Sequence, residues 1–406
     1  IKKIKPNVYV KGPDYKEKKL DITGNIYLEE KAAKKVNCKV VYTESETYSS
    51  SKLLDNFFEK DQINQKKFIK NIKNKSNEKK ILDQLEIIKK KNILLIGDAI
   101  FDEYILAEAL NKSSKDSILT FSIKKKEKYL GGSLAIANNL AEFCNKVNLI
   151  CKIGKSNDEN SFISKNLKKN IRVSGIKAKN FKTILKSRVI NDYDSQKQIG
   201  LYDLENVHLK RSEEEKIIYE IKKIKHKVDH VVISDFGHGL ITDKILMALK
   251  KLNKSIFINS QINSTNIGQH SLDRFKKLDF MSLNSMELRH EMRNDILPIK
   301  NLTKKLCKKL KLKKIFVTNG SKGSILFNKK LNSFTTAPAL TNVVKDRIGS
   351  GDSFFSLASL MSFVDAKDIE SIFLGSLASY FNLQNFANKK TLDSIEIKKA
   401  IIYTLK

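Results

Sequence analysis

Short runs of apolar residues recur along most of the chain, separated by segments whose apolar residues follow a helical period. The runs, each four or five residues long, begin at Asn92, Val147, Val231, Ser255 and Lys314. Buried strands that alternate with helices are typical of βαβ units, which build a mostly parallel sheet covered by helices on both faces. Ligands of such a sheet bind at the carboxyl ends of its strands. The sequence therefore predicts an α/β fold with its site at that edge of the sheet.

Two segments interrupt this alternation of strands and helices. Residues 118–129 and 183–202 alternate polar with β-prone residues, as strands with one exposed face do. Each segment lies between α/β units. We therefore expect a small antiparallel flap that covers the site or joins two copies of the chain.

A Gly-Ser-Gly-Asp turn stands directly before an apolar, helix-like stretch that continues to Val364. Gly349, Ser350 and Gly351 would leave free backbone N–H groups at the positive end of the helix dipole, which is a natural cradle for phosphate. Asp352 would repel a phosphate bound there, so its carboxylate is better suited to accept a proton from the hydroxyl that attacks the phosphate. The alternative is a tight turn that only begins a helix.

Residues 346–355 resemble the second signature of ribokinase-like (PfkB) carbohydrate kinases, Asp-Thr-x-Gly-Ala-Gly-Asp-x-Phe. The match holds at Asp346, Gly349, Gly351, Asp352 and Phe354, whereas Arg347 and Ser350 replace the usual Thr and Ala. Further landmarks of the family follow in the expected order within residues 91–404: Gly97-Asp98-x-x-x-Asp102, Gly131-Gly132 with Ala137 and Asn139, Ser234-Asp235-Phe236-Gly237-His238-Gly239, Asn284-x-x-Glu287, and Val317-Thr318-x-Gly320-x-x-Gly323. The resemblance implies a ribokinase-like sheet with a β flap in residues 91–406, and phosphorylation of a sugar by ATP.

The resemblance also implies a role for each group of residues. Asp352 would be the catalytic base, and the amides of Gly349, Ser350 and Gly351 would stabilise charge on the transferring phosphoryl group. The sugar hydroxyls would be bound by Asp98, Asp102, Gly131, Gly132 and Asn139. The nucleotide would be bound by Thr318, Gly320, Gly323 and Asn388. Mg²⁺ would be organised through water by Asn284 and Glu287.

Several of these residues also have a purely structural interpretation. Asn284 and Glu287 have the spacing of a helix capping box, which is compatible with a role near Mg²⁺. A single glycine after a strand, such as Gly97 or Gly320, can simply form a turn. His238 lies between two glycines, where we favour an ordinary loop residue over a contact to substrate.

Within the family, the sequence is similar to heptose-phosphate kinases of lipopolysaccharide-precursor synthesis, which phosphorylate the anomeric hydroxyl of a heptose 7-phosphate. The similarity lies in Gly97-Asp98, Lys112–Lys115, Tyr129–Gly132 and Ser234–Gly239. Two positions depart from it. Ala135 stands where those kinases have Asn, and Asn259-Ser260-Gln261 replaces the Asp-Pro-Lys of many relatives. Loss of one sugar-binding amide predicts retained phosphoryl transfer with an altered choice of sugar.

Residues 1–58 look like the back half of a cytidylyltransferase-like nucleotidyltransferase, a partial Rossmann-like α/β unit. The resemblance lies in residues 5–15 and in residues 48–53, where Ser49, Ser50 and Ser51 would otherwise be a helix cap. The His-x-Gly-His of such enzymes is missing, because no His precedes His208. We expect this unit to be inactive as it stands, and residues 59–90 to form a helical linker. A longer chain would resemble bifunctional nucleotide-sugar enzymes.

The composition bears on partners and location. Lys and Arg number 77 against 45 acidic residues, a net charge of +32, which could attract nucleic acid or an anionic membrane. The excess is mostly Lys spread along the chain, so we expect a solvated surface and neither partner. Four scattered cysteines and the lack of a long apolar run favour a cytoplasmic protein. A homodimer and, as a rival function, a non-catalytic sugar or nucleotide sensor remain open.

Overall fold

The computed structural model describes residues 1–11, 26–42, 62–112, 116, 118–178, 180–204, 209–263, 265–268, 270–386 and 388–405. The chain divides into two compact units. The large unit is residues 83–392, and the small unit is residues 1–82 together with residues 393–406. The serine cluster at residues 49–51 lies outside the described residues, as do Gly12 and the Ser113–Lys115 part of the heptose-kinase similarity.

The large unit is built on a nine-stranded sheet with the order β15-β14-β13-β12-β11-β10-β3-β6-β7. Seven neighbouring strands are parallel, and the two at the β15 edge are antiparallel. All five apolar runs of the sequence are strands of this sheet, which confirms the expected fold. The strands are β3 (Asn92–Gly97), β6 (Lys146–Gly154), β7 (Ile171–Ala178), β10 (His230–Asp235), β11 (Ile256–Ser260), β12 (Phe280–Asn284), β13 (Lys314–Thr318), β14 (Ser324–Asn328) and β15 (Ser333–Ala337).

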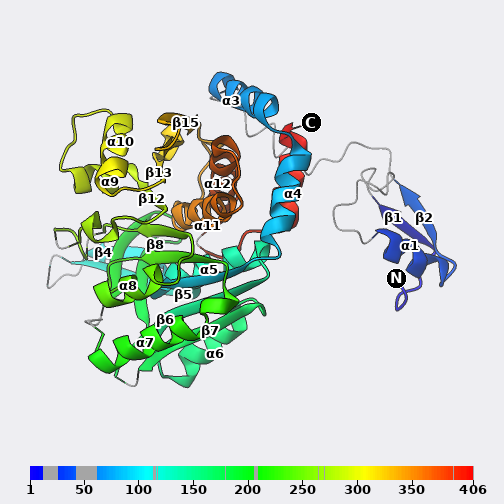
Figure 1. The fold of residues 1–406 in the computed structure, drawn as a ribbon. Helices are drawn as coiled ribbons and strands as arrows, with labels where there is room; N and C mark the ends of the chain where they lie inside the picture. Colours follow the sequence, from blue (N-terminus) through cyan, green and yellow to red (C-terminus); the bar gives the residue numbers. More distant parts are fainter. Residues whose placement is uncertain are drawn as a thin grey trace. The chain divides into compact units, whose positions relative to one another are not determined.

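Helices cover both faces of this sheet (Figure 1). On one face, α7 (Arg211–Lys223), α8 (Asp243–Lys250), α9 (Ser285–Met292) and α10 (Ile299–Lys309) share one apolar core with the strands. On the other face, Phe257 of β11 packs edge-on against Phe355 of α11 (Ser350–Phe363), with ring centroids 5.4 Å apart. Successive side chains of a strand point to opposite faces, so Ile256 and Ile258 join the first core while Phe257 joins the second.

The remaining helices of the large unit are α5 (Gly132–Phe143), α6 (Asn157–Asn166) and α12 (Asp368–Leu383), with 3₁₀ turns at Lys225–Lys227, Leu272–Phe275 and Gly320–Lys322. In α11 every side chain from Asp352 to Phe363 is buried. A helix that is buried all round lacks an amphipathic pattern. Its buried serines Ser356, Ser359 and Ser362 donate their hydroxyls to backbone carbonyls of the same helix. Asp352 is the acidic side chain among these buried residues.

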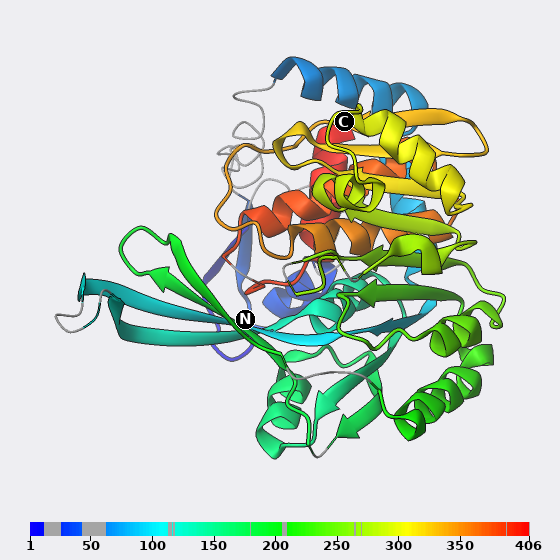
Figure 2. The same ribbon diagram turned by 90° about the vertical axis from the view of Figure 1, so that its left-hand side faces the viewer.

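A second sheet, with the order β5-β4-β8-β9, forms the flap. Its strands are β4 (Ala99–Lys112), β5 (Leu119–Gly131), β8 (Ile184–Asn191) and β9 (Lys197–Asp203). The two interrupting segments of the sequence supply β5, β8 and β9, as expected. The β4–β5 and β8–β9 pairs are antiparallel, but β4 pairs with β8 in parallel, so the flap is mixed rather than wholly antiparallel. Figure 2 shows its strands extending away from the main sheet.

The small unit contains two parallel strands, β1 (Val8–Lys11) and β2 (Lys39–Tyr42), joined through α1 (Ile26–Lys34). This part of the chain therefore has the order strand, helix and strand. The ammonium of Lys11 lies 2.5 Å from Glu29, and the Tyr42 hydroxyl donates to Glu30 at 2.8 Å, which fixes the helix against the strands. Helices α3 (Gln62–Lys75) and α13 (Ser394–Leu405) also belong here, and α4 (Glu78–Ile88) has residues of both units.

In the described part of the chain, no helix is both long and apolar enough to cross a membrane.

Candidate active site

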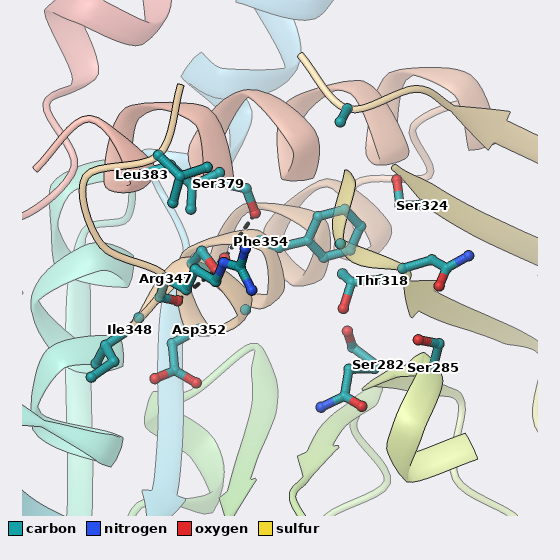
Figure 3. Close-up of a pocket in the computed structure, with 18 of the residues that line it drawn as sticks. Ser282, Ser285, Thr318, Ser324, Arg347, Ile348, Asp352, Phe354, Ser379 and Leu383 are labelled. Carbon is teal, nitrogen blue, oxygen red and sulfur yellow. Dashed lines mark hydrogen bonds between the residues drawn. The ribbon is translucent and has the colours of Figure 1, made fainter. Parts of the chain in front are cut away.

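A pocket of about 830 Å³ opens where β11, β12 and β13 end and α11 begins. Figure 3 shows Asp352 at the start of α11, with Ser282, Ser285 and Thr318 across the cavity from it. Residues of the flap complete the lining, among them Asp102 of β4. The site therefore lies at the carboxyl ends of the strands, as the sequence analysis expects.

The start of α11 has the geometry of an anion site. Gly349, the N-cap, has a left-handed backbone (φ 80°), and a Cβ there would meet the Asn388 Oδ1 atom at 2.2 Å, so glycine is required. The first N–H groups of a helix have no partner within it, and Ser350 turns its hydroxyl back onto the Arg347 carbonyl at 2.9 Å. Gly349, Ser350 and Gly351 all line the pocket. A phosphate can reach their amides without competition from these side chains.

The carboxylate of Asp352 is buried beside these amides and also lines the pocket. Burial and the Asp102 charge raise its pKa, Lys186 and a hydrogen bond from Gln261 lower it, and the balance of these effects is a pKa of about 7. Gln261 Nε2 donates to Asp352 Oδ1 at 3.0 Å. A carboxylate with a pKa near neutrality is well matched to accept a proton at physiological pH.

Asp102 links the flap to the start of α11. Its Oδ1 atom accepts from Arg188 of β8 at 2.7 Å, and its Oδ2 atom accepts from Asn388 Nδ2 at 3.2 Å. A Cβ on Gly131 would lie 2.2 Å from Oδ2, so this glycine makes room for the carboxylate. Asp102 lines the pocket, whereas Gly131 and Asn388 do not. The sequence analysis predicts that Asn388 binds the nucleotide and that Asp102 binds the sugar, and the structure places these two side chains in contact.

Asp98 and Asn139 make contacts within the protein and lie outside the set of pocket-lining residues. Asp98 accepts from the backbone amides of Phe236 at 2.9 Å and of His238 at 3.4 Å. Its burial, together with the Asp235 charge, raises its pKa. Asn139 donates to the Ser353 hydroxyl at 3.3 Å and accepts from the Leu392 amide at 3.1 Å. Gly132, in contrast, lines the pocket and has φ 53°.

The residues assigned to the nucleotide after β13 form one turn on the pocket wall. The Asn319 amide donates to the Gly323 carbonyl at 2.7 Å, and Gly320 and Gly323 have φ values of 54° and 83°. A Cβ on Gly323 would lie 2.0 Å from the Ala337 carbonyl oxygen, whereas nothing lies within 4 Å of a Cβ on Gly320. Thr318 stands at the start of this turn, and all three assigned residues line the pocket.

This contrast predicts unequal effects of two matched substitutions. Gly320→Ala should lower the free energy of unfolding by about 1–2 kcal/mol, because alanine is strained in the left-handed backbone conformation of this position. Gly323→Ala adds a clash with backbone atoms and should cost about 3 kcal/mol or more. Thermal unfolding of the two variants measures the difference. Equal losses of stability would contradict this description of the turn.

Asn284 and Glu287 form the capping box of α9 and also line the pocket. The Asn284 side chain accepts from the Glu287 amide at 2.9 Å, and Glu287 accepts from the Asn284 amide at 2.7 Å. Burial raises the pKa of Glu287 to about 7, and Asp352 contributes. The described residues contain no cluster of three or more His, Cys, Asp or Glu that could hold a metal.

Two cations of the pocket wall, Lys186 and Arg188, are not among the predicted site residues, and Gln261 was noted only as part of a departure from the Asp-Pro-Lys of many relatives. Lys186 is buried, which lowers its pKa, and its Nζ atom lies 5.7 Å from the ring centres of Tyr202 and Phe236. The spacing of Lys186 and Arg188 offered a signal, because residues i and i+2 of a strand share one face. The two cations therefore lie on one face of β8, the face that lines the pocket.

The fold, with its flap and pocket, is of the ribokinase type. Arabidopsis thaliana ribokinase, solved with ribose and ATP, aligns with a TM-score of 0.58 at 18% identity, over 78% of this chain and 99% of that one. Escherichia coli phosphofructokinase-2, solved with potassium, aligns with a TM-score of 0.63 at 12% identity, over 78% of this chain and all of that one. The family model of pfkB family carbohydrate kinases matches residues 90–389. The chain belongs to this family and is a carbohydrate kinase.

Curated relatives carry the name bifunctional protein HldE. The protein from Aliarcobacter butzleri (strain RM4018) is 27% identical over 301 residues, which are 72% of this chain and 60% of the relative. The protein from Helicobacter pylori (strain G27) is 26% identical over 294 residues, 68% of this chain and 60% of the relative. The chain thus spans about 60% of the length of these relatives. The nucleotidyltransferase-like part of the interpretation, residues 1–58, lies outside the family match and stays a prediction.

Proposed function

We propose that this kinase transfers the γ-phosphoryl group of ATP to the anomeric hydroxyl of a phosphorylated sugar, with a heptose 7-phosphate as acceptor. The buried Asp352 carboxylate at the start of α11 carries the proposal, because it places a base of near-neutral pKa beside the first backbone amides of a helix. A sensor has no use for such a base. The similarity of Gly97-Asp98, Tyr129–Gly132 and Ser234–Gly239 to heptose-phosphate kinases supports the choice of heptose.

The pocket residues divide the chemistry between them. Asp352 takes the proton of the acceptor hydroxyl. The hydroxyl oxygen forms a bond to the γ-phosphorus, and the bond from that phosphorus to the ADP oxygen breaks. The amides of residues 349–351 stabilise charge on the transferring group. Thr318, Gly320 and Gly323 hold the nucleotide, and Asp102 orients the acceptor. Asn284 and Glu287 would hold Mg²⁺ through water, and the bound ion would supply neutralisation of phosphate charge.

The flap cations favour an acceptor that already carries a phosphate. Arg188 is neutralised by Asp102 at 2.7 Å, so a second buried cation, Lys186, adds positive charge to the wall. Burial of a cation is costly unless anions lie near it, and Asp98, Asp102 and Asp352 already act on Lys186 in this way. An acceptor phosphate beside Lys186 would add a further anion that this cation can bind.

Lys186→Met tests this recognition, because it keeps the length of the side chain and removes its charge. We expect the KM for a phosphorylated acceptor to rise roughly 30-fold, the loss of one charged hydrogen bond, while the KM for ATP changes little. Steady-state assays well above pH 7 keep Asp352 deprotonated in both proteins. Lys126→Met, at an exposed flap position, is the control and should behave as wild type. Equal KM values in all three proteins would contradict the assignment.

The product would be a sugar bisphosphate with an activated anomeric position. We propose that, after removal of the other phosphate, it feeds a nucleotidyltransferase reaction that yields a nucleotide-linked sugar. The resemblance of residues 1–58 to such a transferase and the word bifunctional in the name of the relatives support this place in the sequence of reactions. A homodimer joined through the flap stays a prediction, and β9, exposed along its length, is the strand available for it.

A further inference from the structure

A chain of side-chain amides leads from the sheet to the catalytic carboxylate. Asn259, on β11, donates through Nδ2 to the Ser282 carbonyl of β12 at 3.0 Å. Gln261 Nε2 lies 3.3 Å from Asn259 Oδ1 and 3.0 Å from Asp352 Oδ1. All four of these residues line the pocket.

The direction of these hydrogen bonds is fixed by their starting point. A carbonyl oxygen only accepts, so Asn259 must turn its NH₂ group toward Ser282 and its oxygen toward Gln261. Gln261 must then turn its NH₂ group toward Asn259, and the same group faces Asp352. If the Gln261 side-chain amide could rotate by 180°, its oxygen and not its NH₂ group would at times face Asp352. The hydrogen bonds through Asn259 fix the orientation in which the NH₂ group faces Asp352 Oδ1.

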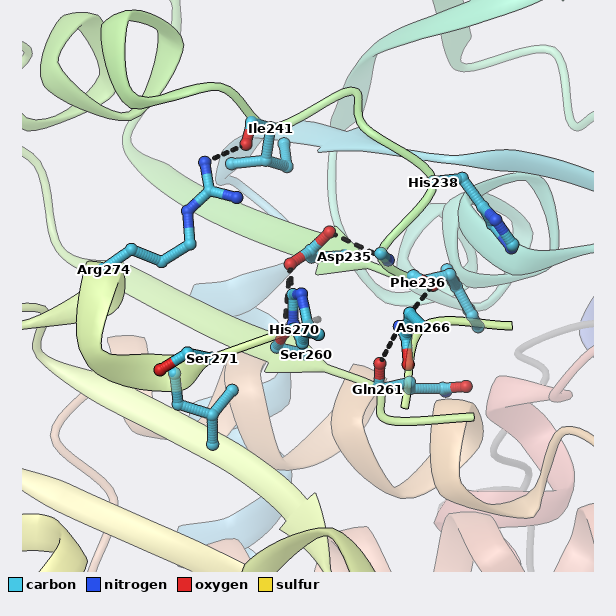
Figure 4. Close-up of polar contacts among 12 residues, drawn as sticks. Asp235, Phe236, His238, Ile241, Ser260, Gln261, Asn266, His270, Ser271 and Arg274 are labelled. Atoms are coloured by element: carbon cyan, nitrogen blue, oxygen red, sulfur yellow. Dashed lines mark hydrogen bonds and ion pairs between the residues drawn. The ribbon is translucent and has the colours of Figure 1, made fainter. Parts of the chain in front are cut away.

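The backbone of Gln261 is held as firmly as its side chain. Its amide donates to the Asp235 carbonyl at 2.8 Å, and its carbonyl accepts from Asn266 Nδ2 at 2.8 Å. Figure 4 shows Gln261 beside Asn266, with Asp235 on the neighbouring strand. Asp235 itself accepts from the Ser260 hydroxyl at 3.0 Å, which ties the ends of β10 and β11 together. Gln261 thus projects from a rigid edge of the sheet.

We infer that Gln261 is a positioning residue for the proposed kinase reaction, holding Asp352 Oδ1 so that Oδ2 is the oxygen that receives the acceptor proton. In the described part of the chain, Gln261 is the side chain that donates to this carboxylate. The inference rests on the proposed role of Asp352 as base. Gln261 acts through Asp352 and does not itself take part in proton transfer.

The neutrality of Gln261 matters as much as its geometry. The charged groups that act on Asp352 from the elements around it are Asp102 of β4, Lys186 of β8 and Glu287 of α9. Burial and Asp102 bring the pKa of Asp352 to about 7. A neutral donor orients the carboxylate and lowers that pKa only modestly, whereas a cation at the same place would lower it strongly.

Two substitutions of Gln261 by unbranched residues of similar length separate the effect of orienting Asp352 from the effect of a charge beside it. Gln261→Met removes the donor, and we expect kcat to fall about tenfold and the acidic limb of the pH profile of kcat/KM to move to higher pH. Gln261→Lys keeps a donor and adds charge, so the same limb should move about one unit to lower pH. KM for ATP should change little in either variant. A residue that is merely structural would not move the limb in opposite directions.

The outcome can be separated from that of the proposed function. If wild type turns over an acceptor but both variants keep its pH profile, or shift it in the same direction, the inference about Gln261 is wrong and the proposed function stands. If wild type turns over no acceptor, the pKa of Asp352 is followed by NMR with ¹³C-labelled aspartate, and the resonance is assigned by its loss in Asp352→Asn. Opposite shifts in the two Gln261 variants then support the positioning, and coincident titrations overturn it.

Discussion

Asp352→Asn is expected to lower kcat about 10³-fold, because removal of a general base typically costs 10²- to 10⁴-fold. The change is nearly isosteric and keeps an acceptor for Gln261, so the site should hold its shape. ATP should bind at least as tightly as to wild type, since a negative charge beside the phosphates is removed. Turnover assays give kcat, and isothermal titration gives the affinity for ATP.

The pH dependence of the same variant identifies the base. The wild-type kcat/KM should rise with pH through about 7 as Asp352 loses its proton. The residual activity of the variant should lack this limb. Asp158→Asn, at an exposed position in the first turn of α6, controls for the loss of one carboxylate and should match wild type. Retention of more than a tenth of the activity by Asp352→Asn would rule out the assigned role.

Asp102→Ala is expected to cost both stability and catalysis. It leaves Arg188 without its ion partner at 2.7 Å and Asn388 without an acceptor at 3.2 Å. Breaking a buried ion pair destabilises a protein by about 3–5 kcal/mol, and we expect the lower value because the Arg188 side chain is 15% exposed. The kcat/KM for the acceptor should fall about 10²-fold or more, since its orientation is lost. Chemical denaturation and steady-state kinetics measure the two effects.

A double variant separates these two effects. In Asp102→Ala with Arg188→Met, the uncompensated cation is gone, so most of the stability should return. The activity should not return, because the carboxylate that orients the acceptor is still absent. Recovery of activity along with stability would mean that Asp102 only neutralises Arg188.

The sequence predicts the main sheet well because each buried parallel strand is a continuous apolar run, and its neighbours in the sheet do not alter that pattern. It predicts β4 poorly. Residues 103–110, Glu-Tyr-Ile-Leu-Ala-Glu-Ala-Leu, have the composition of a helix, yet they form a strand paired on both sides, with β5 and with β8. Strand pairing between distant segments outweighs local propensity there.

In the candidate site, residues in local motifs are likewise predictable from the sequence, and residues that reach the pocket from distant strands are not. The turn at residues 349–352, the glycines after β13 and the capping box at Asn284 are local motifs, so the sequence could place them on the pocket wall. Lys186 and Gln261 reach the same pocket from β8 and from the end of β11, and no local pattern connects them to Asp352. For Asn139 and Asn388, the resemblance to the family predicts that they belong to the site. It does not predict their hydrogen-bond partners, which are Ser353 and Asp102.

The most direct test of the account is a measurement of ADP release by the purified chain with Mg·ATP, against heptose and hexose phosphates and the corresponding free sugars. Phosphorus NMR of the product locates the new phosphate. We predict turnover with a phosphorylated sugar, preferentially a heptose 7-phosphate, with the phosphate on the anomeric oxygen and no turnover by Asp352→Asn. Binding of ATP without turnover of any acceptor would contradict the account and favour a sensor.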